Sequence, residues 1–185
     1  EEKGVNFILD LADSEEEYLS HLEDPNFASE YAANLYQEGK VALLSMSSNY
    51  GTDIYKQKLV SGLKKMITFN GPFYVHCLEG KDRTGFVCLI LEALAGATYD
   101  EMLDDYMKTY DNYYGINQEG SPNKYEAVAS LYFDDFVSYL SYLHGTNNTT
   151  LLQSASFQQD VINYLLDGGM TRGEINTLHD LIAKE

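Results

Sequence analysis

The chain has 185 residues, 44% of them hydrophobic, and a formal net charge of −17. This length suits one domain with a sizeable core. No apolar run approaches the roughly 20 residues of a membrane-spanning helix, so we expect no integral membrane segment. The acidity argues against a nucleic-acid partner, because no basic stripe is present to neutralise a phosphate backbone.

Three short apolar runs in the first half of the chain predict β-strands separated by helices. The strands are expected at residues 6–10, 41–46 and 73–76. One helix is expected to begin at residues 13–17, and two further helices are expected to cover residues 26–38 and 53–69. Strands that alternate with helices favour a mainly parallel central sheet flanked by helices, an α/β fold.

The second half of the chain is predicted to be entirely helical. Thr98 and Glu101 form a capping box that starts a helix reaching about residue 110. Residues 111–121 have the composition of a loop, and Pro122 opens a helix to about residue 143. A linker-like turn at residues 145–150 precedes helices at about residues 156–166 and 171–183. We expect one domain over residues 1–185, with a helical extension from about residue 98.

The segment from Val75 to Gly85 reads VHCLEGKDRTG and joins the third strand to an apolar helix. Such a turn points unpaired backbone N–H groups and the positive end of the helix dipole at one spot, which is a binding site for an anion. Arg83 adds a planar guanidinium group that can donate hydrogen bonds to two phosphoryl oxygens. The same field lowers the pKa of Cys77 and favours its nucleophilic thiolate.

The pattern Cys-x5-Arg-Thr, from Cys77 to Thr84, resembles the signature loop of the cysteine-dependent protein-tyrosine-phosphatase superfamily. The longer match HCLEGKDRTG is similar to the loop of bacterial tyrosine and dual-specificity phosphatases, which often also accept phosphoinositides. Residues 5–11 resemble the early strand of that family, and residues 168–175 resemble its C-terminal helix entry.

The resemblance implies a phosphatase-like fold and a phosphomonoester hydrolase that works through a phosphocysteine. Its substrates would be phosphotyrosine, other phosphoproteins or phosphoinositides, and it would need no cofactor or metal. The alternative is a pseudophosphatase or interaction module that binds phosphate without turnover. The sequence leaves the oligomeric state open and the compartment undecided between cytoplasmic and secreted.

Two features depart from the family pattern. The family's Asp-Leu-Arg becomes Asp10-Leu11-Ala12 here, which removes one possible phosphate-side cation. Family members usually carry a segment before the first strand, whereas this sequence starts close to the strand and without Met. We therefore expect a trimmed chain that lacks the N-terminal segment of the family.

The resemblance assigns roles along the loop. Cys77 is the expected nucleophile, and Arg83 binds the phosphoryl oxygens and stabilises developing charge. Thr84 is expected to hydrogen-bond the Cys77 sulfur, and His76 to organise the loop. The phosphate-binding residues are expected to be Leu78, Glu79, Gly80, Lys81, Asp82, Arg83 and Thr84.

The general acid is less well defined by the sequence. The leaving oxygen needs a proton donor, which in this superfamily is usually an Asp on a separate loop. Asp82 inside the loop is favoured over Asp53, and Asp10 ranks third because it is better explained as a structural hydrogen-bonding group. Cys88, the second cysteine, is expected to be a buried core thiol.

Overall fold

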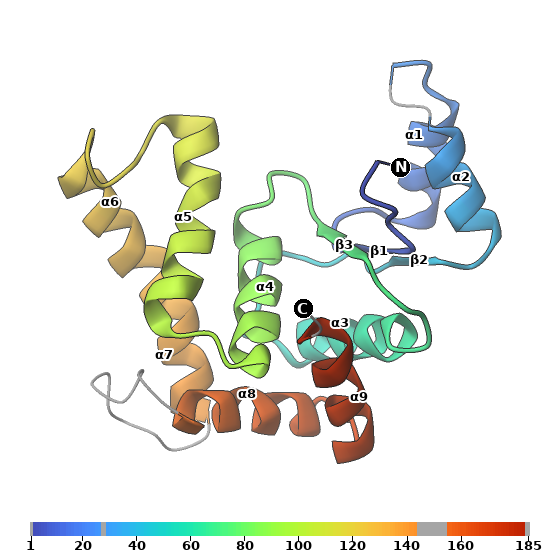
Figure 1. Cartoon of the computed structure of the whole chain (residues 1–185). Coiled ribbons are helices and arrows are strands. Elements are labelled where there is room, and N and C mark those ends of the chain that lie inside the picture. Colours follow the sequence, from blue (N-terminus) through green and yellow to red (C-terminus); the bar gives the residue numbers. More distant parts are fainter. Residues whose placement is uncertain (1, 27–28, 144–154, 184–185) are drawn as a thin grey trace. The chain divides into compact units, whose positions relative to one another are not determined.

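The computed structural model describes residues 2–26, 29–143 and 155–183 (Figure 1). Contacts within the chain define two compact units. The sheet unit comprises Glu1–Thr84 and Gly168–Glu185, and the helical unit comprises Gly85–Asp167.

The sheet unit contains three strands that are all parallel, in the order β2-β1-β3. They are β1 (Phe7–Asp10), β2 (Val41–Leu43) and β3 (Phe73–His76). In the central strand, Ile8 is in register with Val41 on one side and with Tyr74 on the other. The predicted parallel sheet is confirmed, and its strands all end toward the same edge.

Helices cover both faces of this sheet. On one face, Ile8 and Val41 form a buried cluster with Tyr18 and Leu35, which belong to α1 (Glu15–Glu23) and α2 (Glu30–Gln37). On the other face, α3 (Asp53–Met66) lies so close that a Cβ on its Gly62 would come within 2.7 Å of a Leu9 methyl group. Successive strand residues point to opposite faces, so this arrangement buries β1 on both sides.

The C-terminal helix α9 (Arg172–Ile182) also belongs to the sheet unit. It begins at a capping box made by Thr171 and Glu174. The Glu174 carboxylate lies 3.5 Å from Lys64 Nζ of α3, and this ion pair connects the two helices.

The helical unit is built around aromatic side chains. Its helices are α5 (Tyr99–Tyr114), α6 (Pro122–Val128), a π-helical turn η1 (Ala129–Phe133), α7 (Asp134–Leu143) and α8 (Ala155–Asp167), together with most of α4 (Asp82–Ala95). Phe86 makes edge contacts with Phe136 and Tyr164, at centroid distances of 5.4 and 6.0 Å. Among the described residues of the second half of the chain, every regular element is helical, as predicted.

Several predicted boundaries were wrong for local reasons. Residues 111–114 are helical, not loop, because α5 continues until Gly115 caps it with a φ of +61°. Residues 122–143 are not one α-helix, because η1 interrupts them. The second strand ends at Leu43, and α2 starts at Glu30 because the Ser29 side chain caps it. The turn predicted at residues 145–150 lies outside the described residues.

A search of the described helices finds none that combines the length and the apolar character needed to cross a membrane.

Gly85 permits the close approach of α4 and α5. A Cβ at this position would lie 2.5 Å from Cε2 of the buried Tyr106 ring. We predict that Gly85→Ala lowers the free energy of unfolding by about 1–3 kcal/mol through overpacking. Urea denaturation of the variant and the wild type measures this change.

Gly173→Ala is the matched control, because Gly173 also lies in the first turn of a helix but its Cβ would meet nothing closer than 3.9 Å. It is expected to keep or raise stability, by up to about 1 kcal/mol. Equal effects of the two substitutions would contradict the proposed steric role of Gly85.

Candidate active site

The loop between β3 and α4 has the geometry of an anion site. β3 ends at His76 and α4 starts at Asp82, so five residues make the connection. Gly80 adopts a φ of +71°, a left-handed conformation that favours glycine. The turn leads directly into a helix of 14 residues, whose first N–H groups and dipole favour an anion.

Cys77 is partly buried at the start of this turn. Burial by itself acts to raise the pKa of the thiol, but hydrogen bonds from the Thr84 hydroxyl and from the backbone N–H groups of Thr84, Gly80 and Glu79 act in the opposite direction. Their combined effect lowers the pKa below its ordinary value. The loop therefore favours the thiolate, which is the nucleophilic form of cysteine.

The Thr84 hydroxyl is buried in the first turn of α4. The Cys77 sulfur is the group with which it interacts. A hydroxyl placed in this way stabilises the sulfur as an anion.

Arg83 is held in place by the chain that follows β2. Its Nη1 donates a hydrogen bond of 2.9 Å to the carbonyl oxygen of Met46. This contact crosses 37 residues of sequence and ties the first turn of α4 to the neighbouring part of the sheet unit. It occupies one nitrogen of the guanidinium fork, and the other nitrogens can serve a phosphoryl group.

Tyr55 of α3 is a residue of this site that the sequence did not reveal. Its side chain is 2% exposed. Burial raises the pKa of its hydroxyl, the negative charge of Cys77 raises it further, and the positive charge of Arg83 lowers it. Tyr55 therefore lies near both groups. In the sequence it occupies an ordinary apolar position of a helix, which gives no sign of this role.

Asp10 and His76 are paired at the ends of β1 and β3, next to the loop. Asp10 is fully buried, and its Oδ1 accepts hydrogen bonds from the backbone N–H groups of Ala12 and Asp13. Its Oδ2 lies 3.7 Å from Nε2 of His76. The His76 ring stacks on Tyr74 at 5.1 Å. These contacts fit a structural role for Asp10.

The two candidate acids differ in position. Asp82 is the first residue of α4, and its carboxylate lies 3.8 Å from Lys81 Nζ. Lys81 also contacts Glu79 at 3.3 Å, so its charge is shared between two carboxylates. Asp53 is the first residue of α3, with a side chain that is 88% exposed and 3.9 Å from Lys56. Asp82 therefore lies where the loop meets α4, beside Lys81, whereas the Asp53 side chain is exposed to solvent.

Within the part of the chain that the structure describes, there is no group of three or more His, Cys, Asp and Glu side chains arranged to hold a metal ion.

Comparison with known proteins identifies the relatives of this chain. The family model described as "Tyrosine phosphatase family" matches residues 2–184. The chain belongs to the tyrosine phosphatase family. The expected relationship to cysteine-dependent tyrosine phosphatases is thereby confirmed.

A curated relative is the triple specificity protein phosphatase PtpB of Mycobacterium tuberculosis. It is 31% identical over 84 residues, and the match covers 40% of this chain and 30% of the relative. This chain thus aligns with less than a third of that protein.

The lowered pKa of Cys77 makes its reactivity testable. We predict that iodoacetamide alkylates Cys77 faster than Cys88 at neutral pH, because more of it is thiolate. Thr84→Ala should shift the midpoint of Cys77 alkylation to higher pH, since a hydrogen bond to the anion is lost. Alkylation rates measured at each cysteine by mass spectrometry across a pH series give both results.

Thr84→Ser is the control, because it retains the hydroxyl, and it should keep the wild-type midpoint. A midpoint that is the same in the wild type and in Thr84→Ala would show that Thr84 does not stabilise the thiolate.

Proposed function

We propose that this protein is a cysteine-dependent phosphomonoester hydrolase that transfers the phosphoryl group of its substrate to Cys77. The observation that carries the proposal is the combination of a Cys77 thiol of lowered pKa with Arg83 in the first turn of the helix that follows the Cys77 loop. Family membership supports a phosphorylated substrate.

In the first step, the Cys77 thiolate attacks phosphorus while the bond between phosphorus and the leaving oxygen breaks. The loop N–H groups and Arg83 hold the other phosphoryl oxygens and stabilise their charge. Asp82 donates a proton to the leaving oxygen, which departs as an alcohol or phenol. The product of this step is a phosphocysteine.

In the second step, water attacks the phosphocysteine and the sulfur–phosphorus bond breaks. The Asp82 carboxylate accepts a proton from the water, and the sulfur leaves as a thiolate that Thr84 stabilises. Inorganic phosphate is released, and Asp82 is again protonated. The cycle is balanced without a metal or a redox cofactor.

We propose phosphotyrosine as the main substrate, with other phosphoproteins and phosphoinositides as further substrates. The broad range is supported by the name of the relative, a triple specificity protein phosphatase, and by the GKDRTG loop that runs from Gly80 to Gly85.

The nucleophile can be tested with p-nitrophenyl phosphate in the presence of excess chelator. The wild type should hydrolyse it and be inhibited by vanadate, whereas Cys77→Ser should fall to background and still bind inorganic phosphate. Cys88→Ser serves as the control for loss of a cysteine and should remain active. Activity of Cys77→Ser near that of the wild type would refute the mechanism, and inactivity of every protein would favour the phosphate-binding alternative.

The two candidate acids are separated by their dependence on the leaving group. Asp82→Asn should reduce kcat for phenyl phosphate by about 10²-fold, because phenolate is a poor leaving group that needs a proton. The loss should be much smaller with 2,4-dinitrophenyl phosphate, whose leaving group departs unprotonated. Asp53→Asn is the matched variant and should retain kcat for both substrates.

The opposite pattern, with the leaving-group effect in Asp53→Asn, would transfer the role of general acid to Asp53.

A further inference from the structure

Strand β2 forms one edge of the sheet. In the described part of the chain it pairs only with β1. The backbone of Lys40 and Leu44 faces β1, since Ile8 N donates to Lys40 O and Leu44 N donates to Asp10 O. Successive residues alternate along a strand, so the N–H and C=O groups of residues 41 and 43 face away from the sheet. An edge of this kind is a template for another extended chain.

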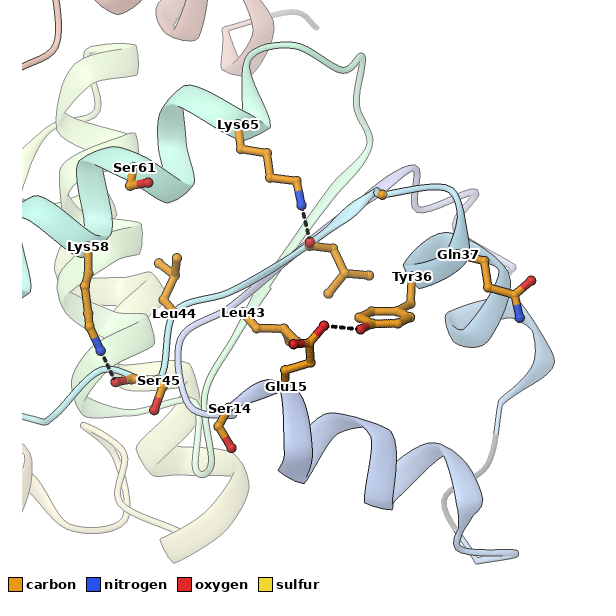
Figure 2. A pocket seen from close by; sticks show the side chains of 12 residues that line it. Ser14, Glu15, Tyr36, Gln37, Leu43, Leu44, Ser45, Lys58, Ser61 and Lys65 are labelled. Atoms are coloured by element: carbon orange, nitrogen blue, oxygen red, sulfur yellow. Dashed lines mark hydrogen bonds between the residues drawn. The ribbon is translucent and has the colours of Figure 1, made fainter.

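A pocket of about 830 Å³ lies along this edge. Leu43 and Ser45 line it from the strand side, and Lys58, Ser61 and Lys65 line it from α3 (Figure 2). The volume falls within the usual range of binding sites for small ligands and short segments. All of these residues belong to the sheet unit.

Two lysines reach from α3 to the edge strand. Lys65 Nζ donates a hydrogen bond to the carbonyl oxygen of Val41, and Lys58 Nζ donates one to the carbonyl oxygen of Ser45 (Figure 2). Each bond has a length of 2.6 Å. They thus occupy the carbonyl oxygen of Val41, which faces away from the sheet, and that of Ser45, which lies beyond the end of β2. Lysines at a sheet edge prevent uncontrolled pairing with other strands, but their long side chains can move aside for a specific partner.

The charge of these two lysines is not neutralised locally. Among the described residues, no carboxylate lies within 4.0 Å of Lys58 or Lys65, whereas Lys64, next to them on the same helix, pairs with Glu174. The pocket does contain one acid, Glu15, which accepts a hydrogen bond from the Tyr36 hydroxyl. In a chain with a net charge of −17, two such cations on one wall favour a ligand with negative charges.

The pocket also leads toward the candidate active site. Ser45, at its end, precedes Met46, whose carbonyl oxygen accepts the hydrogen bond from Arg83. The pocket and the candidate active site are thus connected through neighbouring residues of this segment.

We propose that this edge of β2 binds an extended acidic segment of the phosphoprotein substrate as an added strand. The backbone N–H groups of the segment donate to the outward carbonyls of β2, and its acidic side chains pair with the ammonium groups of Lys58 and Lys65. The inference rests on the proposed function only in naming a phosphoprotein as the partner. A peptide fits better than a lipid headgroup, because a headgroup has no backbone to pair with the strand.

Binding can be measured without turnover. The probe is a fluorescein-labelled peptide of alternating Glu and Val, without phosphate, and the readout is fluorescence anisotropy with the full chain. Lys58→Gln and Lys65→Gln remove the charge but keep a hydrogen-bond donor, and each should weaken binding about fivefold, the size expected for one charge pair. Lys64→Gln, on the same helix but outside the pocket, should bind as the wild type does.

A second peptide, N-methylated at alternate residues, tests for backbone pairing and should not bind. Three results would overturn the proposal: no binding of the first peptide, equal weakening by Lys64→Gln, or equal binding of the methylated peptide, which would indicate simple ion attraction. Because no hydrolysis is involved, these results are independent of the outcome with p-nitrophenyl phosphate.

Discussion

The hydrogen bond between Arg83 Nη1 and the Met46 carbonyl holds the candidate site together. Arg83 belongs to the first turn of α4, and Met46 lies just beyond β2, so the bond joins the start of α4 to the far edge of the sheet. It has this position because all three strands are parallel and end at the same side. The guanidinium that we propose binds the phosphoryl group is thus already oriented in the free protein, which avoids the entropic cost of ordering it during binding.

The pKa of Cys77 results from the opposing effects of burial and hydrogen bonding. Burial removes water from the sulfur and works against the thiolate, while Thr84 and the loop amides supply the donors that water would have provided. The net effect favours the anion in a protein whose overall charge is strongly negative. At physiological salt the screening length is about 8 Å, so these close donors outweigh the distant carboxylates.

The sequence predicts those parts of the molecule that depend on local patterns. The residue types and spacing of the loop from His76 to Gly85 indicated an anion site, and short apolar runs located the three strands. Helix ends were harder, because α5 passes through the polar residues 111–114 and ends only where Gly115 adopts a left-handed φ. Such endings depend on backbone geometry more than on composition.

Long-range contacts could not be predicted in the same way. Tyr55 looks like any apolar residue of an amphipathic helix, and its proximity to Cys77 and Arg83 results from the packing of α3 against the sheet. The bonds of Lys58 and Lys65 to the edge of β2 have the same origin, since each joins residues that are far apart in the sequence. Residue type and spacing carry no information about such contacts.

The most direct test of this account is to trap the phosphorylated enzyme. The wild type and Cys77→Ser are mixed with a phosphotyrosine peptide, quenched in acid within milliseconds, digested and analysed by mass spectrometry. The account predicts a phosphoryl group on Cys77 of the wild type during turnover and none on the Cys77→Ser protein. Continuous release of phosphate without a phosphorylated Cys77 at any time, or a phosphoryl group on another residue, would contradict it.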